Sequence, residues 1–357
     1  MNEEIYAPSG LLFQWHITNR CNLRCAHCYQ DTYKGDELTF DQLIGILNQY
    51  KDILKYWRDM GKRVRGNITV TGGEPFVRKD FMDLLQVFHE DKKEYSFAIL
   101  TNGYFINEDI ANRLSKLQPR FVQVSIEGSE KTHESIRGKG SYQKAISGLK
   151  ALKKAKIRSF ISFTAHKENY LEFPEAVKLG RKLKVDRVWS DRLVPQGNGA
   201  EKLLLTKEET NEFMELMYKE RMKAKQAWFN KTEVSMHRAL QFLKAGGRPY
   251  HCHAGDKLIT IMPNGDLYPC RRMPITVGNV LNTPLKDLYY QSEVFKELRE
   301  KSFDNEGCEK CFYSKVCKGG LRCLTYATTG SLFKKDPGCF YNQEKANSLK
   351  HYSQVNH

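Results

Sequence analysis

The stretch LLFQWHITNRCNLRCAHC, residues 11–28, joins an apolar run to three closely spaced cysteines. Its first part, LLFQWHIT, has the short apolar composition of a buried β-strand. Cys21, Cys25 and Cys28 follow directly, with three and then two residues between them. Ligands of parallel sheets bind at the carboxyl ends of the strands, so this order predicts a site at one mouth of a sheet.

Similar strands alternate with amphipathic helical patterns along the first 225 residues. Strands are expected at 11–18, 67–72, 96–103, 121–128, 158–165 and 186–194, and helices at 39–60, 79–93, 107–117, 142–155, 169–184 and 207–225. Six such units imply parallel strands with right-handed crossovers. Six is fewer than the eight of a closed TIM barrel, so we predict an α/β fold with a partial (β/α)6 TIM-like barrel.

Cysteine, proline and glycine become more frequent from about residue 250. Within this part, PNGDLYPC (263–270) predicts a hairpin, with Asn264-Gly265 as a type I′ turn. We therefore expect a barrel over 1–230, a linker helix over 231–250, and a small cysteine-rich α+β domain with a C-terminal helix over 251–357.

Composition restricts location and partners. The 57 Lys and Arg exceed the 42 Asp and Glu, giving a net charge of +15. We assign this excess to lysine-rich helix faces such as KALKKAKIR (150–158) and expect no nucleic-acid partner. The N-terminus is not a signal peptide, and no apolar run suits a membrane span, so we expect a cytoplasmic protein. Thiols stay reduced there, and ten cysteines then need a role other than disulfides.

The first three cysteines suit an iron–sulfur cluster with one free coordination position. A cubane cluster takes four thiolates, so three leave one iron open. An open position is where a metal site performs chemistry. A structural zinc site, with His27 as the fourth ligand, is the alternative.

The cysteine spacing CX3CX2C, the GGEP run at 72–75 and the SIEG run at 125–128 together resemble the radical SAM superfamily over about residues 10–225. The resemblance implies that the cysteine trio ligates a 4Fe–4S cluster whose open iron binds S-adenosylmethionine (SAM). It also implies that a 5′-deoxyadenosyl radical abstracts hydrogen from the substrate. The family often has Asp where Glu127 stands.

The same resemblance implies further SAM contacts. His27 would lie near the adenine, and Gly72, Gly73, Glu74 and Pro75 would receive the methionine amino group. Ser125, Glu127 and Arg137 would contact the ribose and the carboxylate.

The seven later cysteines resemble the SPASM extension of radical SAM enzymes over about residues 250–342, which holds two auxiliary 4Fe–4S clusters. The resemblance implies an outer cluster on Cys308, Cys311, Cys317 and Cys339, and an inner one on Cys252, Cys270 and Cys323. Five residues separate Cys317 from Cys323 where the common pattern has three.

This assignment leaves the inner cluster one ligand short. Water, a substrate thiol or one of His251, His253 and Asp256 is expected there. Two zinc sites are the alternative use of the seven later cysteines.

SPASM enzymes mostly modify peptides, so the resemblance implies a peptide maturase acting on a small precursor peptide, with a flavodoxin- or ferredoxin-type electron donor. The first strand begins by residue 11, so we expect either a separate leader-binding protein or a short substrate. Gln14, His16, Asp191 and Arg192 are candidates to face the substrate.

Three other functions are open. The first is a small-molecule enzyme such as a tetrapyrrole side-chain decarboxylase. The second is a sulfatase-type maturase, which is disfavoured because Arg271 follows Cys270 where that group has an acidic base. The third is a non-catalytic iron–sulfur protein, disfavoured because the SAM motifs are intact. Arg271 and Arg272 would suit an acidic peptide or a C-terminal carboxylate.

Overall fold

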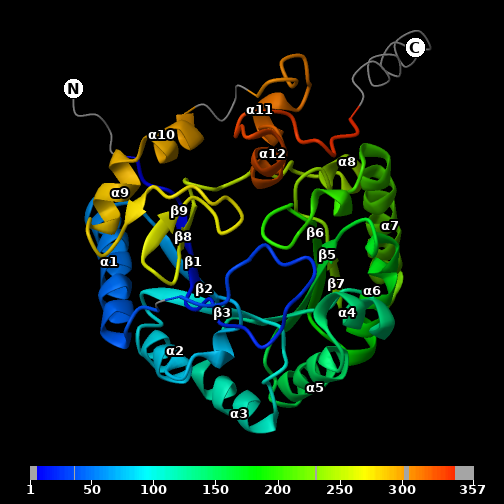
Figure 1. Ribbon diagram of the computed structural model, residues 1–357, viewed down its shortest axis with the longest axis horizontal. Helices are drawn as coiled ribbons and strands as arrows, with labels where there is room; N and C mark the ends of the chain where they lie inside the picture. The colour runs from blue at the N-terminus through cyan, green and yellow to red at the C-terminus, as the bar shows by residue number, and fades with distance from the viewer. Residues whose placement is uncertain (1–5, 36, 230, 301–304, 342–357) are drawn as a thin grey trace.

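The computed structural model describes residues 6–35, 37–229, 231–300 and 305–341. Its centre is a ten-stranded sheet in the order β10-β9-β8-β1-β2-β3-β4-β5-β6-β7. Figure 1 shows the sheet curving around the middle of the molecule, with helices α1 to α7 outside it. The partial parallel barrel predicted from the sequence is confirmed.

The barrel units follow the predicted order. The parallel strands are β1 (Gly10–His16), β2 (Arg65–Thr71), β3 (Tyr95–Thr101), β4 (Val122–Ser125), β5 (Ser159–Ala165) and β6 (Arg187–Arg192). The helices are α1 (Phe40–Asp59), α2 (Phe81–Glu90), α3 (Glu108–Leu117), α4 (Glu130–Arg137), α5 (Ser141–Lys154), α6 (Phe173–Leu183) and α7 (Lys207–Gln226). Helix α4 was not predicted, because its eight residues are too short for a clear apolar period.

Local sequence explains how each unit begins and packs. In α1, Thr39 and Gln42 form a capping box that pairs the first free amides of the helix. Apolar side chains at helical spacing, among them Leu43, Ile46 and Leu47, are buried against the sheet. Tyr50 Oη then donates to the backbone oxygen of Leu11 at 2.7 Å, which fixes α1 to β1.

The sheet continues across the boundary expected near residue 250. Strand β7 (Glu233–Ser235) pairs parallel with β6, and β8 (Leu258–Ile261) pairs parallel with the free edge of β1. The 231–250 segment is therefore not one helix: it contains β7 and the four-residue α8 (Phe242–Ala245). Ile259 and Ile261 belong to the same apolar core as the barrel, because the register with β1 places them beside the buried Phe13 and Trp15.

The hairpin at 263–270 is confirmed, but its turn is of another type. Strands β8 and β9 (Asp266–Tyr268) are antiparallel, and the Gly265 amide donates to Met262 O at 3.0 Å. Only Gly265 of the Asn-Gly pair has a positive φ, of 89°. Pro263 occupies the second position of this turn, where its fixed φ favours an ordinary type I turn followed by a left-handed glycine.

The remaining elements cover one side of the barrel. They are β10 (Gly278–Asn279), α9 (Leu285–Gln291), α10 (Glu293–Glu300), α11 (Ser314–Cys317) and α12 (Arg322–Thr329). Figure 1 shows α11 and α12 together between α10 and α8. The predicted C-terminal helix lies outside the described residues. Within the described residues, no helix combines the length and apolar character needed to cross a membrane.

Candidate active site

The loop after β1 carries the first three cysteines and is held from two sides. The Ala26 amide donates to Ile136 O at 2.8 Å, which ties the loop to the end of α4. Cys28 O accepts the amides of Asn198 and Gly199 from the segment after β6. The three thiols therefore sit on a braced loop at the carboxyl end of the barrel.

The GGEP turn packs directly against this loop. The Gly73 amide donates to Thr18 O at 2.7 Å and the Glu74 amide to Arg20 O at 2.9 Å. A Cβ on Gly73 would lie 2.3 Å from Arg20 O, so no other residue fits without moving the cysteine loop. Gly72 and Gly73 also line the cavity that holds the cysteine trio.

Glu74 and Pro75 are not among the residues that line this cavity. Both Glu74 oxygens are used inside the protein: Oε1 accepts Thr101 Oγ1 at 2.8 Å, and Oε2 accepts the Asn102 amide at 2.8 Å. Burial raises the pKa of Glu74 to about 7, although these hydrogen bonds favour its charged form. The structure thus places Glu74 as a brace between β2 and β3, behind the surface where the sequence motif implied a SAM contact.

A buried ionic network lies under the cysteine loop. Glu127 is fully buried, accepts Arg137 Nε at 3.1 Å, and lies 3.3 Å from His27 Nε2. Its other oxygen accepts the Thr164 amide at 2.9 Å. Burial alone would raise the pKa of Glu127, but Arg137 and then His27 reverse this and hold it far below its usual range.

These contacts separate the predicted SAM residues into two groups. His27, Ser125 and Arg137 line the cavity, whereas Glu127 does not, because its carboxylate is enclosed by its partners. Ser162, opposite Ser125 at 3.4 Å between hydroxyl oxygens, also lines the cavity. The sequence analysis missed Ser162; its polar hydroxyl within an apolar strand was the available signal.

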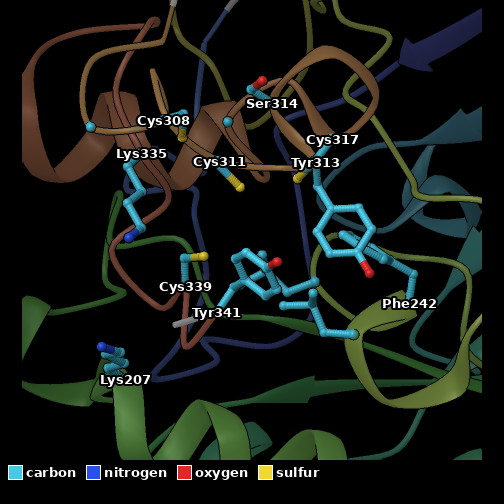
Figure 2. Close-up of a pocket in the computed structure, with 14 residues that line it drawn as sticks. Lys207, Phe242, Cys308, Cys311, Tyr313, Ser314, Cys317, Lys335, Cys339 and Tyr341 are labelled. Atoms are coloured by element: carbon cyan, nitrogen blue, oxygen red, sulfur yellow. The ribbon is translucent and has the colours of Figure 1, made fainter. Parts of the chain in front are cut away.

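The ten cysteines divide between two cavities. Six of them line the larger one, of about 520 Å³: Cys21, Cys25, Cys28, Cys252, Cys270 and Cys323. The other four, Cys308, Cys311, Cys317 and Cys339, line a cavity of about 370 Å³, and Figure 2 shows their thiols around the same space. The structure therefore groups the later cysteines as the SPASM resemblance implied, including Cys323 with its altered spacing.

The donor set fits iron–sulfur clusters. All ten cysteines are free thiols. Burial raises the pKa of Cys21 to about 11 and that of Cys323 to about 12, so their thiolates need the positive charge of a metal. Among the described residues, no three His, Cys, Asp or Glu side chains converge on a single ion. Each thiolate of a cubane cluster instead binds a different iron around a shared space.

The candidate fourth ligands of the inner set do not reach the larger cavity. Its lining includes Cys252 but none of His251, His253 and Asp256. Asp256 accepts the hydroxyl of Tyr6 and lies 3.8 Å from His253 Nδ1. This leaves the neighbourhood of Cys252, Cys270 and Cys323 open toward the same cavity as the first trio.

Arginine dominates the charge of the larger cavity. Of the described residues that line it, seven are arginines, Arg120, Arg137, Arg187, Arg192, Arg238, Arg271 and Arg272, and one is acidic, Asp191. Asp191 accepts both Arg238 and Arg272, at 2.8 and 2.9 Å. Arg192 is paired with the buried Asp336, which joins β6 to the cysteine-rich part.

Only some of the residues expected to face the substrate lie on the wall of the larger cavity. Gln14, Asp191 and Arg192 line the larger cavity, but His16 does not and is almost fully buried. Burial, and then the charge of Arg271, lower the pKa of His16 to about 3. Arg238 and Trp189 also line the cavity and were missed, because a helix was expected around Arg238 and Trp189 was assigned only to a strand.

The fold is a parallel partial barrel with a braced cysteine trio at the carboxyl ends of its strands, and a second cysteine set follows it. This combination defines a class of iron–sulfur enzymes. Residues 15–180 match the family model of the radical SAM superfamily, and residues 252–312 match that of SPASM, an iron–sulfur cluster-binding domain. The chain belongs to the radical SAM superfamily and carries a SPASM domain.

The relatives of the chain include heme synthases and a maturase, at sequence identities below 30%. An AdoMet-dependent heme synthase of Methanosarcina barkeri is 25% identical, over 94% of this chain and 97% of its own length. The mycofactocin maturase MftC of Mycolicibacterium smegmatis is 28% identical, over 91% of this chain and 81% of its own. A solved structure of Streptococcus suis SuiB bound to S-adenosylmethionine has the same fold, with a TM-score of 0.73 at 20% identity over 93% of this chain and 77% of SuiB.

Proposed function

We propose that the protein is a radical SAM/SPASM peptide maturase whose substrate is a ribosomally made peptide with a carboxylate close to the modified residue. SAM and its cluster, when bound, supply a hydrogen-abstracting radical. This chain's residues then have to bind the peptide, orient one C–H bond and keep water out.

The surroundings of Arg271 are the observation that supports a carboxylate in the substrate. Five of the seven arginines on the cavity wall form an ion pair with a carboxylate: Arg137, Arg187, Arg192, Arg238 and Arg272. Arg271 instead donates to the hydroxyl of Thr71 at 3.0 Å and lies over the ring of Tyr29. Tyr29 follows the cysteine trio, and Cys270 precedes Arg271. A guanidinium suits a carboxylate ligand well. A substrate carboxylate bound by Arg271 would place the substrate carbon next to it between the first cysteine trio and the inner cysteine set.

We propose three 4Fe–4S clusters. The first trio would hold the SAM-binding cluster, with Gly72, Gly73, His27, Ser125 and Arg137 as the groups nearest SAM. The inner and outer auxiliary clusters would use the two later cysteine sets. Three such clusters contain about twelve irons. A reconstituted chain with about four irons, and zinc on the later cysteines, would contradict this assignment.

A low-potential flavodoxin- or ferredoxin-type protein is the proposed electron donor, and a separate leader-binding protein is a further proposed partner. The family's chemistry begins with a one-electron reduction of the SAM-binding cluster, which such a donor would supply.

A tetrapyrrole side-chain decarboxylase is the second candidate. The names of several relatives, among them the Methanosarcina barkeri heme synthase, favour it. The arginine-rich cavity would also suit propionate carboxylates.

The test is coexpression of this chain with each short peptide encoded beside it, followed by mass spectrometry of the peptide. A loss of two hydrogens is expected for a cross-link, a loss of carbon dioxide for decarboxylation, and an unchanged mass with altered stereochemistry for epimerisation. Cys25→Ala should abolish both the modification and 5′-deoxyadenosine formation. Unmodified peptides, together with turnover of iron coproporphyrin by the purified enzyme, would select the tetrapyrrole function instead.

A further inference from the structure

The larger cavity has a second end, away from the cysteines. Its lining includes Arg120, Phe121, Phe160 and Arg187, which stand at the starts of β4, β5 and β6. Strand ends opposite the carboxyl ends form the other face of the barrel, so these residues lie across the barrel from the SAM motifs. Gln123 and Trp189, joined by a 2.9 Å hydrogen bond, line the wall between the two ends.

Three guanidinium groups gather around two stacked rings at this end. The Phe121 and Phe160 centroids are 4.3 Å apart, with 16° between the ring planes. Arg120 lies 5.2 Å from the Phe121 centroid, and Arg158 and Arg187 lie 5.2 and 4.9 Å from that of Phe160. The rings form a rigid floor that holds three cations close to one another.

The positive charge of this cluster is only partly balanced. Arg187 is paired with Glu233 at 2.8 Å. Arg120 donates to the neutral amide oxygen of Asn67 at 2.8 Å, and within the described residues neither Arg120 nor Arg158 has a carboxylate in salt-bridge distance. Burial, and then the charges of Arg158 and Arg187, lower the pKa of Arg120. An anion would relieve this repulsion.

The strand register indicates the shape of that anion. Val122 is opposite Ser159 and Phe160 is opposite Arg187. Arg120 lies two residues before β4, Arg158 lies one residue before β5, and Arg187 begins β6, so the three arginines mark the starts of three neighbouring strands. Neighbouring strands lie about 4.8 Å apart. Several carboxylates on the flexible side chains of an acidic peptide can reach such a row of cations, whereas one compact anion cannot contact all three at this spacing.

We propose that this arginine cluster, Arg120, Arg158 and Arg187, binds an acidic segment of the substrate peptide at the amino end of the barrel. The site is separate from the SAM and cluster residues, and the cavity connects the two ends. The proposal rests on the proposed peptide substrate: the acidic segment would anchor the chain while another residue is modified near the cysteines.

The experiment is calorimetric titration of the anaerobic, cluster-loaded protein with acetylated tetraglutamate, with acetylated tetraglutamine as the neutral probe. Tetraglutamate should bind, tetraglutamine should not, and added salt should weaken the binding. Arg120→Gln/Arg158→Gln should weaken it at least about tenfold. Lys150→Gln/Lys153→Gln, which removes the same charge from the exposed face of α5, should leave it unchanged.

Equal weakening in the two double variants, or no binding of tetraglutamate, would overturn the proposal. Binding of pyrophosphate at this cluster without binding of tetraglutamate would overturn it as well. Arg158→Gln alone keeps the test valid if the double variant fails to fold, because the Arg158 side chain is exposed. The readout needs neither SAM cleavage nor a natural substrate, so failure of this anchor and failure of the peptide-maturase function give different results.

Discussion

Arg137 links Glu127 to Cys25. Its Nε donates to Glu127 Oε1 at 3.1 Å, and its Nη1 lies 3.7 Å from Cys25 Sγ. The buried Glu127 carboxylate thus holds the Arg137 guanidinium beside Cys25, a proposed cluster ligand. Partners behind a metal site commonly decide how its ligands are oriented.

Glu127→Gln should lower 5′-deoxyadenosine formation about 10- to 100-fold, the usual effect of removing such a partner. The amide keeps the size of the side chain but leaves Arg137, whose side chain is only 11% exposed, without its counterion. Dithionite-driven SAM cleavage measures the rate. Glu130→Gln is the control, because Glu130 is an exposed carboxylate at the start of α4, the helix that ends at Arg137. If Glu127→Gln cleaved SAM at the wild-type rate, Glu127 would have no role in the SAM site.

Gly73→Ala should disrupt the cysteine loop. The added Cβ would lie 2.3 Å from Arg20 O and 2.7 Å from Asn19 O, both backbone atoms, so the loop has to move. We expect less iron on the first cysteine set and loss of SAM cleavage. Gly45→Ala is the matched control: its Cβ meets nothing within 4 Å in α1, so it should be stabilising by about 0.5–1 kcal/mol. Equal iron content in both variants would contradict the packing argument.

The parts of the fold predicted from sequence are those set by local pattern. Strands β1 to β6 and the cysteine loop follow from apolar runs and from residues close together in the chain. The pairing of β8 with β1 could not be predicted, because it joins residues about 245 positions apart and depends on which edge is free. The motif indicated that Glu74 and Glu127 matter, but not that both lie behind the wall. Their position is set by partners on other strands, such as Thr101 and Thr164.

Glu74 should make the protein less stable as the pH rises from about 5 to 7. Its pKa is raised from 4.5 to about 7 in the folded protein. Between these values the folded state keeps a proton that the unfolded chain has lost, so raising the pH lowers the free energy of unfolding. The loss is complete above the folded pKa and amounts to about 3 kcal/mol at most.

Thermal unfolding of the anaerobic protein from pH 5 to 8 measures this effect. Glu74→Gln should flatten the slope of melting temperature against pH. Glu90→Gln, an exposed carboxylate on α2, should leave the slope as it is. Parallel slopes in wild type and Glu74→Gln would show that Glu74 is ionised in the folded protein over the whole range.

The Arg192–Asp336 pair should be the main polar connection between the barrel and the cysteine-rich part. Two hydrogen bonds of 2.8 and 2.6 Å join the side chains, and both residues are buried. Asp336 also accepts the amides of Leu321 and Gly338, which lie close in sequence to Cys323 and Cys339. Losing this carboxylate therefore removes support from both later cysteine sets.

Asp336→Asn should cost about 3–5 kcal/mol, because it leaves Arg192 buried without a counterion. Glu175→Gln, which breaks the exposed pair with Lys178, should cost no more than about 1 kcal/mol. Iron analysis provides the second readout: Asp336→Asn should lose iron from the later cysteines while the first trio still cleaves SAM. The uncharged double variant Arg192→Met/Asp336→Leu should recover part of the stability, because it leaves no unpaired charge in the core. If Asp336→Asn keeps full stability and full iron content, the shared sheet, the apolar core and the remaining polar contacts, such as Arg272 with Asp191, are enough to hold the two parts together.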